Sequence, residues 1–323
     1  MNQATAIAHT NIALIKYWGK ANEELRLPYT DSLSLTLDEF FTQTTAIVNS
    51  EKEDIFILDN QLQTPEKSQR VFKFLDYFRK QYGINEHFKI ESQNHVPNSA
   101  GLASSASAFA ALSGALSKAV KLDTDLTELS RLARVGSGSA SRSIFGGFVQ
   151  WHAGTDNQSS YSEQLSTASE SDISVVSVII NSDKKSISST SGMILTKQTS
   201  PFYKLWPDIV KQDLTDIKQA IAVNDLSKIG EIAEHNAMEM HALTLSANPP
   251  FTYFEPATIK IINYVQELRK KGILAYYTID AGPNVKIICS KKDAPLIKQK
   301  ISDNLDEVIK VIITQPGPSI TFK

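Results

Sequence analysis

The segment PNSAGLASSASAFAAL, residues 97–112, constrains the fold of this chain more than any other stretch of its sequence. From Leu102 onward its apolar residues recur every three or four positions, which predicts a helix. The start of that helix is rich in glycine, alanine and serine, so little would cover its unpaired N–H groups or the positive end of its dipole. Such a helix start can hold a phosphate group. The same small residues would also permit close helix packing, and this segment alone leaves both interpretations open.

The composition indicates two ordinary globular domains without a large charged surface. The chain has 323 residues, of which 41% are hydrophobic, and its 33 Lys and Arg nearly balance its 35 Asp and Glu. Partners such as nucleic acid or an anionic membrane are therefore not expected, and a bound anion must be held by local groups. The single cysteine, Cys289, excludes an internal disulfide, and we see no signal peptide or apolar run of the roughly 20 residues that cross a bilayer. We therefore expect a soluble cytoplasmic protein.

The first half of the chain reads as a mixture of strands and helices. Strands are predicted at 41–48, 54–58 and 87–92, and an amphipathic helix at 68–83 that ends at Gly83. The first domain is therefore expected to be mixed α/β.

The second half begins after a polar stretch. Residues 155–171 predict an exposed excursion, and residues 173–180 an apolar strand. We place the domain boundary just after that strand, which gives domains of residues 1–182 and 183–323. The rest of the chain predicts a helix at 261–272, strands at 273–279 and 285–290, a helix at 293–306 and a strand at 308–314.

Cations and hydrogen-bond donors follow the first apolar strand, in NIALIKYWGK. Residues 12–15 predict a buried strand, and Lys16, Tyr17 and Lys20 come directly after it. Such a cluster suits a multiply charged anion. Lysines that extend along a packed Trp18 would give the same pattern, and this segment alone does not decide between them.

A second stretch of small residues, GSGSASR, ends in Arg142, a candidate for binding an anion. Residues 136–139 could expose backbone N–H groups as an anion-binding nest, and Arg142 offers a planar fork that matches a carboxylate. The stretch is not a dinucleotide fingerprint, because Ser141 stands where the third glycine belongs and a helix rather than a strand precedes it. Two further stretches, the polar loop at 183–195 and the turn that carries Asp280, are ordinary when taken alone.

Taken together, these stretches resemble the mevalonate diphosphate decarboxylases, which belong to the superfamily of galactokinase, homoserine kinase, mevalonate kinase and phosphomevalonate kinase. The motifs NIALIKYWGK, PNSAGLASSASAFAAL, GSGSASRSIFGG, SSTSGM and DAGPNVK occur in the order and at the spacing of that family, and they cover essentially the whole chain. The resemblance implies a two-domain α+β fold: an N-terminal ribosomal-protein-S5-like α/β domain, a C-terminal ferredoxin-like domain and a ligand cleft between them. It also implies conversion of (R)-5-diphosphomevalonate to isopentenyl diphosphate, ADP, phosphate and CO₂, with ATP and Mg²⁺, in a homodimer.

The resemblance also assigns roles to individual residues. Asp280 would accept or orient the proton of the 3-hydroxyl, Arg142 would bind the carboxylate, and Lys185 would stabilise charge on the transferring phosphoryl group. The substrate would also be held by Asn11, Ala13, Tyr17, Lys20, Ser137, Gly138, Ser139, Ser188 and Ser189. The ATP phosphates would be held by Pro97, Asn98, Gly101, Leu102, Ala103, Ser104, Ser105 and Ser107, and Ser105 would also bind Mg²⁺. Thr190 stands where some members of the family carry a basic residue, so one diphosphate contact is expected to be weaker or to come from elsewhere.

Two other functions fit parts of the sequence. A sister kinase, such as a mevalonate 3-kinase, would phosphorylate a hydroxyl and stop there, but such kinases tend to carry a glycine-rich loop where this chain has DAGPN. A nucleic-acid-binding module could share the fold of the first domain, but the near-neutral charge argues against it.

Overall fold

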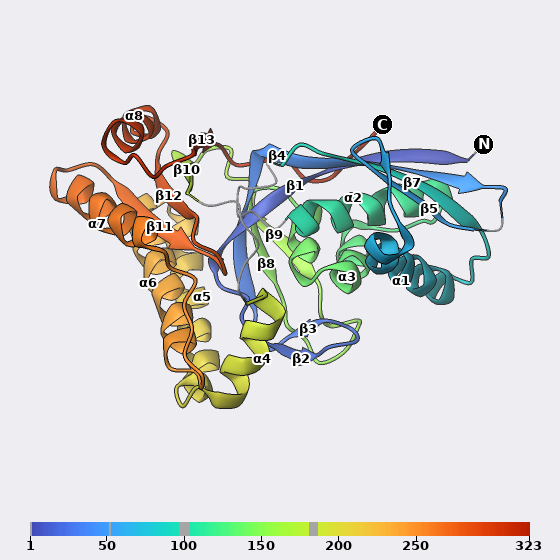
Figure 1. The fold of residues 1–323 in the computed structure, drawn as a ribbon, viewed down its shortest axis with the longest axis horizontal. Helices are drawn as coiled ribbons and strands as arrows, with labels where there is room; N and C mark the ends of the chain where they lie inside the picture. The colour runs from blue at the N-terminus through green and yellow to red at the C-terminus, as the bar shows by residue number, and fades with distance from the viewer. Residues whose placement is uncertain (1, 52, 97–103, 181–186) are drawn as a thin grey trace.

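The chain forms two sheets with helices packed against each, together with a small hairpin (Figure 1). The computed structural model describes residues 2–51, 53–96, 104–180 and 187–323. The two-domain α+β architecture expected from the sequence is confirmed. Within these ranges, no helix is both long enough and apolar enough to cross a membrane.

The first sheet has eight strands and is built around two long neighbours. Its order is β14-β1-β4-β7-β5-β6, with β8 paired to β4 and β9 paired to β8. All pairs are antiparallel except β5 with β7. The strands are β1 (Gln3–Ile15), β4 (Ser32–Asn49), β5 (Ile55–Leu58), β6 (Gln61–Leu62), β7 (His87–Asn94), β8 (Phe148–Trp151), β9 (Ser162–Ser166) and β14 (Thr321–Phe322), and the separate hairpin is β2 (Lys20–Asn22) with β3 (Leu27–Pro28).

Three helices pack against the first sheet: α1 (Pro65–Tyr82), α2 (Ser104–Ala119) and α3 (Leu126–Gly136). Phe78 and Phe109, from α1 and α2, lie in one buried cluster with Phe88 of the sheet. The predicted helix at 68–83 is confirmed and starts three positions earlier, at Pro65. It ends at Gly83, whose φ of 65° is the left-handed conformation that glycine adopts most easily.

The second sheet has four antiparallel strands in the order β11-β12-β10-β13, with helices on both faces. Alternate residues of β12 separate the faces: Ile287 packs in the cluster of α7 and α8, and Ile288 packs in the cluster of α5 and α6. The strands are β10 (Ile173–Ile179), β11 (Ala275–Ile279), β12 (Val285–Ser290) and β13 (Lys310–Thr314), and the helices are α4 (Ser189–Thr199), α5 (Trp206–Ala222), α6 (Leu226–Leu245), α7 (Pro256–Lys270) and α8 (Ala294–Asn304). Short 3₁₀ segments are η1 (Gly138–Ile144) and η2 (Tyr203–Leu205).

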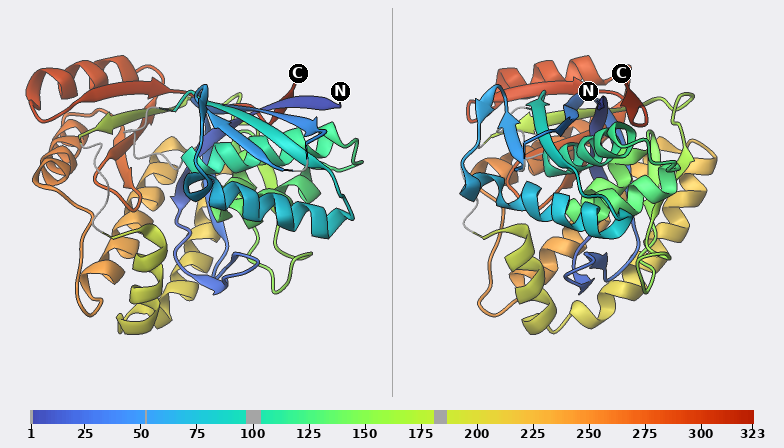
Figure 2. Two further views of the ribbon diagram at one scale, coloured as in Figure 1. Left: turned by 45° about the vertical axis from the view of Figure 1, so that its right-hand side comes forward. Right: turned by 90° about the vertical axis from the view of Figure 1, so that its right-hand side faces the viewer.

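Helix α6 lies between the second sheet and the end of β1 (Figure 2). Leu14 of β1 and Ile232 of α6 belong to one buried cluster, so the two domains share a hydrophobic core. The helix also lies very close to β11, because a Cβ atom on Gly230 would come within 2.2 Å of the ring of Tyr276. Only glycine permits this approach, which fixes the distance between α6 and the strand that precedes Asp280.

The sheets divide the chain differently from the predicted boundary. Strand β10 pairs with β12 and β13, so it belongs to the second sheet, and the division falls before Ile173 rather than after residue 182. The chain later returns to the first sheet, where β14 pairs with β1. The predicted excursion at 155–171 is largely exposed, but residues 162–166 form strand β9 on β8. Local polarity did not reveal this edge strand, because one of its faces is open to solvent.

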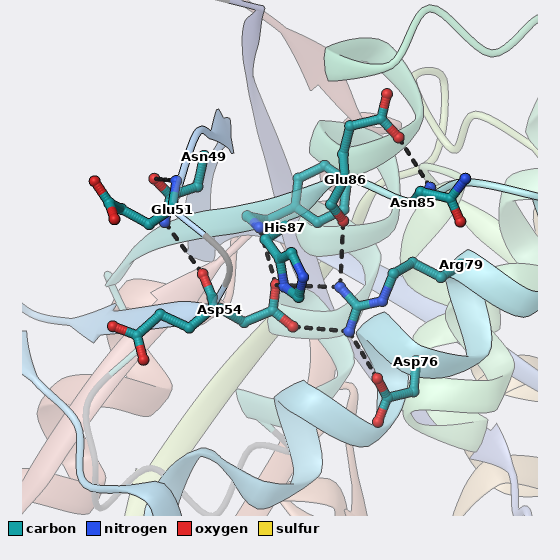
Figure 3. Close-up of polar contacts among 10 residues, drawn as sticks. Asn49, Glu51, Asp54, Asp76, Arg79, Asn85, Glu86 and His87 are labelled. Carbon is teal, nitrogen blue, oxygen red and sulfur yellow. Dashed lines mark hydrogen bonds and ion pairs between the residues drawn. The ribbon is translucent and has the colours of Figure 1, made fainter.

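A cluster around Asp54 ties α1 to β7 (Figure 3). Arg79 donates to both carboxylate oxygens of Asp54, at 3.1 and 2.8 Å, and the backbone N–H of Phe88 donates to Oδ1 at 2.9 Å. His87 lies against the same oxygen, and Asp76 is a second, exposed partner of Arg79. The Asp54 side chain is only 8% exposed, so these hydrogen bonds are largely shielded from water.

We expect Asp54→Ala to lower the free energy of unfolding by roughly 1.5 to 3 kcal/mol, because it leaves a buried N–H and a guanidinium without their acceptor. The control is Asp76→Ala, which removes the exposed partner of the same arginine and should cost less than about 1 kcal/mol. Urea unfolding with an unchanged m-value would measure both variants. Equal losses of unfolding free energy in the two variants would show that Asp54 is not the stabilising partner of Arg79 and Phe88.

Candidate active site

An ion pair between the two domains lies at the centre of the candidate site. Lys16 follows β1 and Asp280 follows β11, and their Nζ and Oδ1 atoms are 2.8 Å apart. Lys16 Nζ also donates to the carbonyl oxygen of Ala13 at 2.8 Å. On the other side, Lys286 of β12 places its Nζ 3.5 Å from Asp280 Oδ2. One carboxylate therefore lies between two buried ammonium groups.

The electrostatics of this cluster favour a bound anion. Burial lowers the pKa of Lys16; Asp280 opposes this effect, while Lys286 and Arg142 lower the pKa further. Burial also lowers the pKa of Arg142 to about 10, again against the effect of Asp280. These four described side chains comprise three cations and one carboxylate, so an incoming anion would relieve their repulsion.

Arg142 is held in one orientation by the strands beside it. Its Nη1 donates to Ser32 Oγ at 2.5 Å, and its Nε and Nη2 donate to Asn11 Oδ1 at 3.3 Å each. Asn11 in turn donates to Ser143 Oγ at 2.8 Å and to the carbonyl oxygen of Ser139 at 3.1 Å. The structure thus joins Asn11 and Arg142, two of the residues that were expected to hold the substrate.

The turn at residues 136–139 adjoins the start of α2. Ser137 Oγ lies 3.1 Å from Ser105 Oγ, which joins two of the predicted anion-binding segments. Tyr17 packs edge-on against Trp151, with ring centroids 4.9 Å apart. A Cβ atom on Gly138 would come within 3.0 Å of Trp151 and 3.1 Å of Tyr17, so glycine brings the backbone close to these rings.

The predicted ATP-binding residues fall partly outside the described ranges. Pro97, Asn98, Gly101, Leu102 and Ala103 lie outside them, as does Lys185. Ser104 is exposed and Ser105 is half-buried, and they are the first described residues of α2. The hydroxyl of Ser107 is buried and bonded to Thr42 Oγ1 at 2.8 Å, so it lies inside the domain rather than at the helix start.

Three cations, Lys20, Arg26 and Arg70, lie near the turn at residues 136–139. Arg70 of α1 donates to the carbonyl oxygen of Gly136 from Nε and Nη2, at 3.3 and 2.9 Å. Partial burial and the charge of Arg26 lower its pKa to about 10. Burial lowers the pKa of Lys20; Glu23 opposes it, and Arg26 and Arg70 act in the same direction as burial. Lys20, Arg26 and Arg70 therefore repel one another beside the turn.

The predicted residues of the 188–190 segment lie at the start of α4. Ser188 is the N-cap, and its Oγ accepts a hydrogen bond from the backbone N–H of Ser191 at 3.0 Å. Its side chain is thus engaged in holding the helix, while the half-buried Ser189 is the first residue of α4. Thr190 is exposed.

Sequence reasoning missed four cationic members of the site. Lys16 lay in a cluster that was noted, but its partner is far along the chain. Lys286 is a lone lysine within an apolar strand. This pattern could have predicted a buried ammonium group with an acidic partner. Arg70 and Arg26 lie on an amphipathic helix and in a polar hairpin, where charged residues are ordinary.

The fold and the site define a class of protein, the small-molecule kinase superfamily of galactokinase, homoserine kinase, mevalonate kinase and phosphomevalonate kinase. Residues 8–162 match the diphosphomevalonate decarboxylase-like N-terminal domain, and residues 175–315 match the mevalonate 5-diphosphate decarboxylase C-terminal domain. The chain belongs to the diphosphomevalonate decarboxylase family.

Individual relatives are similar over nearly their whole lengths. The diphosphomevalonate decarboxylase of Candida albicans is 36% identical over 304 residues, covering 89% of this chain and 84% of the relative. The mevalonate diphosphate decarboxylase from Enterococcus faecalis is 45% identical, with a TM-score of 0.93 and coverage of 99% of this chain and 98% of that one. A structure of MDDEF in complex with MVAPP, AMPPCP and magnesium matches with the same values.

We expect Lys286→Met to raise the pKa of Lys16. The substitution removes a like charge that lowers this pKa, and it leaves Asp280 without its second ammonium partner. Titration of ¹³Cε-lysine-labelled protein by NMR would follow the Lys16 signal. Lys298→Met, on the exposed side of α8, is the control and should leave Lys16 unchanged. An unchanged or lowered Lys16 pKa in Lys286→Met would show that the two lysines do not interact as the structure indicates.

Proposed function

We propose that this chain converts (R)-5-diphosphomevalonate to isopentenyl diphosphate, ADP, phosphate and CO₂ with ATP, as a step of the mevalonate pathway. The observation that supports it most strongly is the ion pair between the buried Lys16 and Asp280, with Arg142 nearby and with Lys20, Arg26 and Arg70 beside residues 136–139. A substrate with a diphosphate at one end and a carboxylate at the other matches these separate cationic groups.

The diphosphate would bind at the turn formed by Ser137, Gly138 and Ser139. Tyr17 and Lys20 adjoin it, and Arg26 and Arg70 supply further positive charge. Three cations that repel one another in the free protein favour a ligand with several negative charges over a ligand with one. Additional cations here would also compensate for a threonine, rather than a basic residue, at position 190.

The carboxylate would bind at Arg142, with Asn11 and Ala13 beside it. Because Asn11 and Ser32 hold the guanidinium in place, its orientation needs no adjustment when substrate binds. The 3-hydroxyl would then lie next to Asp280. Ser189 would contact the substrate from the start of α4, and Ser188 would fix that helix end.

Asp280 would accept or orient the hydroxyl proton, and Lys16 would hold the carboxylate of Asp280 toward it. Hydroxide is a poor leaving group, so the hydroxyl oxygen must first be phosphorylated. When the C3–O bond breaks, positive charge develops at C3, and the electrons of the bond to the carboxylate carbon form the alkene as CO₂ leaves. The negative charge of Asp280 would stabilise that developing charge.

The start of α2 fits the phosphates of ATP. The first backbone N–H groups of a helix are available to a phosphate, and Ser104 and Ser105 would offer hydroxyls beside them. Ser105 would offer its hydroxyl to Mg²⁺, together with phosphate oxygens of ATP. When bound, MgATP supplies the phosphoryl group and neutralises its charge. The resemblance to the family would also assign Lys185 and residues 97, 98 and 101–103, which lie outside the described residues, to the binding and transfer of the ATP phosphates.

We further infer that the chain acts as a homodimer in the cytoplasm, as its resemblance to the family implies. Sedimentation velocity would test the oligomeric state.

A sister kinase would phosphorylate the same hydroxyl without losing CO₂. The similarity of this chain over most of its length to diphosphomevalonate decarboxylases supports decarboxylation over that alternative.

We expect Asp280→Asn to retain binding of substrate and ATP but to lower turnover by about 10²- to 10⁴-fold, because it removes a positioned acid–base group. Release of ¹⁴CO₂ from labelled diphosphomevalonate with ATP measures the reaction directly. ADP formation without CO₂ in the wild type would identify a kinase instead. Turnover like the wild type in Asp280→Asn would end the assignment of Asp280.

We expect Ser105→Asp to abolish MgATP binding, while Ser105→Ala only weakens it. Like charges about 4 Å apart repel by about 4 kcal/mol at an effective dielectric constant near 20, whereas a lost hydrogen bond to a charged group costs roughly 1.5 to 3 kcal/mol. Calorimetric titrations with MgATP and with diphosphomevalonate would separate the two sites. If neither variant changes nucleotide affinity, the serines serve helix packing and ATP binds elsewhere.

A further inference from the structure

Helix α6 holds the backbone on both sides of the Lys16–Asp280 pair. Two of its residues, Asn236 and His241, are fully buried and reach the segments that carry the two charges. They are five positions apart, about 7.5 Å along the helix axis. Neither lies in a motif on which the function was assigned.

Asn236 bonds to the backbone of Lys16. Its Oδ1 accepts a hydrogen bond from the Lys16 backbone N–H at 2.7 Å, and its Nδ2 donates to Asp213 Oδ2 at 2.7 Å. Because a carboxylate accepts hydrogen bonds, Asp213 of α5 orients the amide so that its oxygen faces Lys16. Burial raises the pKa of Glu239, as does the charge of Asp213 beside it. Glu239 therefore takes up the proton of this pair and leaves Asp213 as the acceptor.

His241 bonds to the backbone just before Asp280. Its Nε2 lies 3.3 Å from the carbonyl oxygen of Ile279, so Nε2 carries the hydrogen and donates it. Burial lowers the pKa of His241 to about 3, and the nearby charge of Lys16 acts in the same direction. The ring is therefore a neutral donor at any pH at which the enzyme would work, and it packs against Phe254 with centroids 4.4 Å apart.

We propose that Asn236 and His241 are positioning residues that set Lys16 and Asp280 against each other, an inference that rests on the proposed function. Lys16 and Asp280 come from different domains, and each follows the last residue of a strand. A single rigid helix that bonds to the backbone at both points fixes their separation. The close approach of α6 to β11 at Gly230 also fixes the helix against the strand that precedes Asp280.

The first test compares two substitutions of His241. Phenylalanine keeps a ring against Phe254 but cannot donate, and glutamine can place an N–H near the position of Nε2. We expect His241→Phe to lower kcat by about 10- to 100-fold, since small displacements of reacting groups have effects of this size. KM for diphosphomevalonate and for ATP should stay within about twofold, and His241→Gln should recover most of kcat. Glu231→Gln is the matched control, because that side chain lies on the same helix, is exposed, and pairs with Lys228 rather than with Asp213 or Glu239.

The second test asks whether these residues act through Lys16. We expect Asn236→Ala and His241→Phe each to lower kcat in the wild type, but to have little further effect in Lys16→Met, where the pair is already lost. Equal effects in both backgrounds would show that the two residues stabilise the fold generally and would overturn the proposal. A raised KM with an unchanged kcat in His241→Phe would also overturn it. The same holds if His241→Gln unfolds at the temperature of the wild type but has only the activity of His241→Phe.

One further measurement separates this proposal from the proposed function. If the wild type releases no CO₂, the function is wrong, but the positioning can still be measured in the free protein. The pKa of Lys16, followed by NMR of labelled lysine, should shift in His241→Phe and not in Glu231→Gln. An unshifted Lys16 in His241→Phe would overturn the positioning role whatever the reaction is.

Discussion

The ion pair of the buried Lys16 with Asp280 is the interaction on which the rest of the structure depends. A buried charge is costly unless it is paired, so the ammonium group of Lys16 depends on the carboxylate that the other domain supplies. The shared hydrophobic core around Leu14 and Ile232 supplies the packing that holds the domains together. The ion pair adds specificity, because one register between the domains brings the two charges together.

Much of the fold could be predicted from the sequence, since strands such as 285–290 and the helix ending at Gly83 have a clear local pattern. The domain boundary could not, because periodicity shows that residues 173–180 form a strand but not which sheet they join. Within the site, the small residues at 136–139 and Arg142 were found from their chemistry. The role of Lys16 was not, because its partner lies 264 positions away and only the fold brings the two together.

The distribution of charge explains how a nearly neutral chain can bind a highly charged substrate. The formal net charge is −2, so no long-range field attracts anions. Two local groups of cations are available instead: Lys20, Arg26 and Arg70 beside residues 136–139, and Lys16, Lys286 and Arg142 around Asp280. Burial and the neighbouring cations lower the pKa of Lys16, Lys20 and Arg70. A bound anion would relieve the repulsion between these cations, and this relief would favour its binding.

The return of the chain to its first sheet has a consequence for folding. Strand β14 pairs with β1, so the peptide crosses from one domain to the other twice, before β10 and again after β13. During synthesis the first sheet cannot acquire its last edge strand until the whole second domain has left the ribosome. The two domains must therefore mature together, and cutting the chain at one point between them would leave the end of the second piece attached to the first sheet.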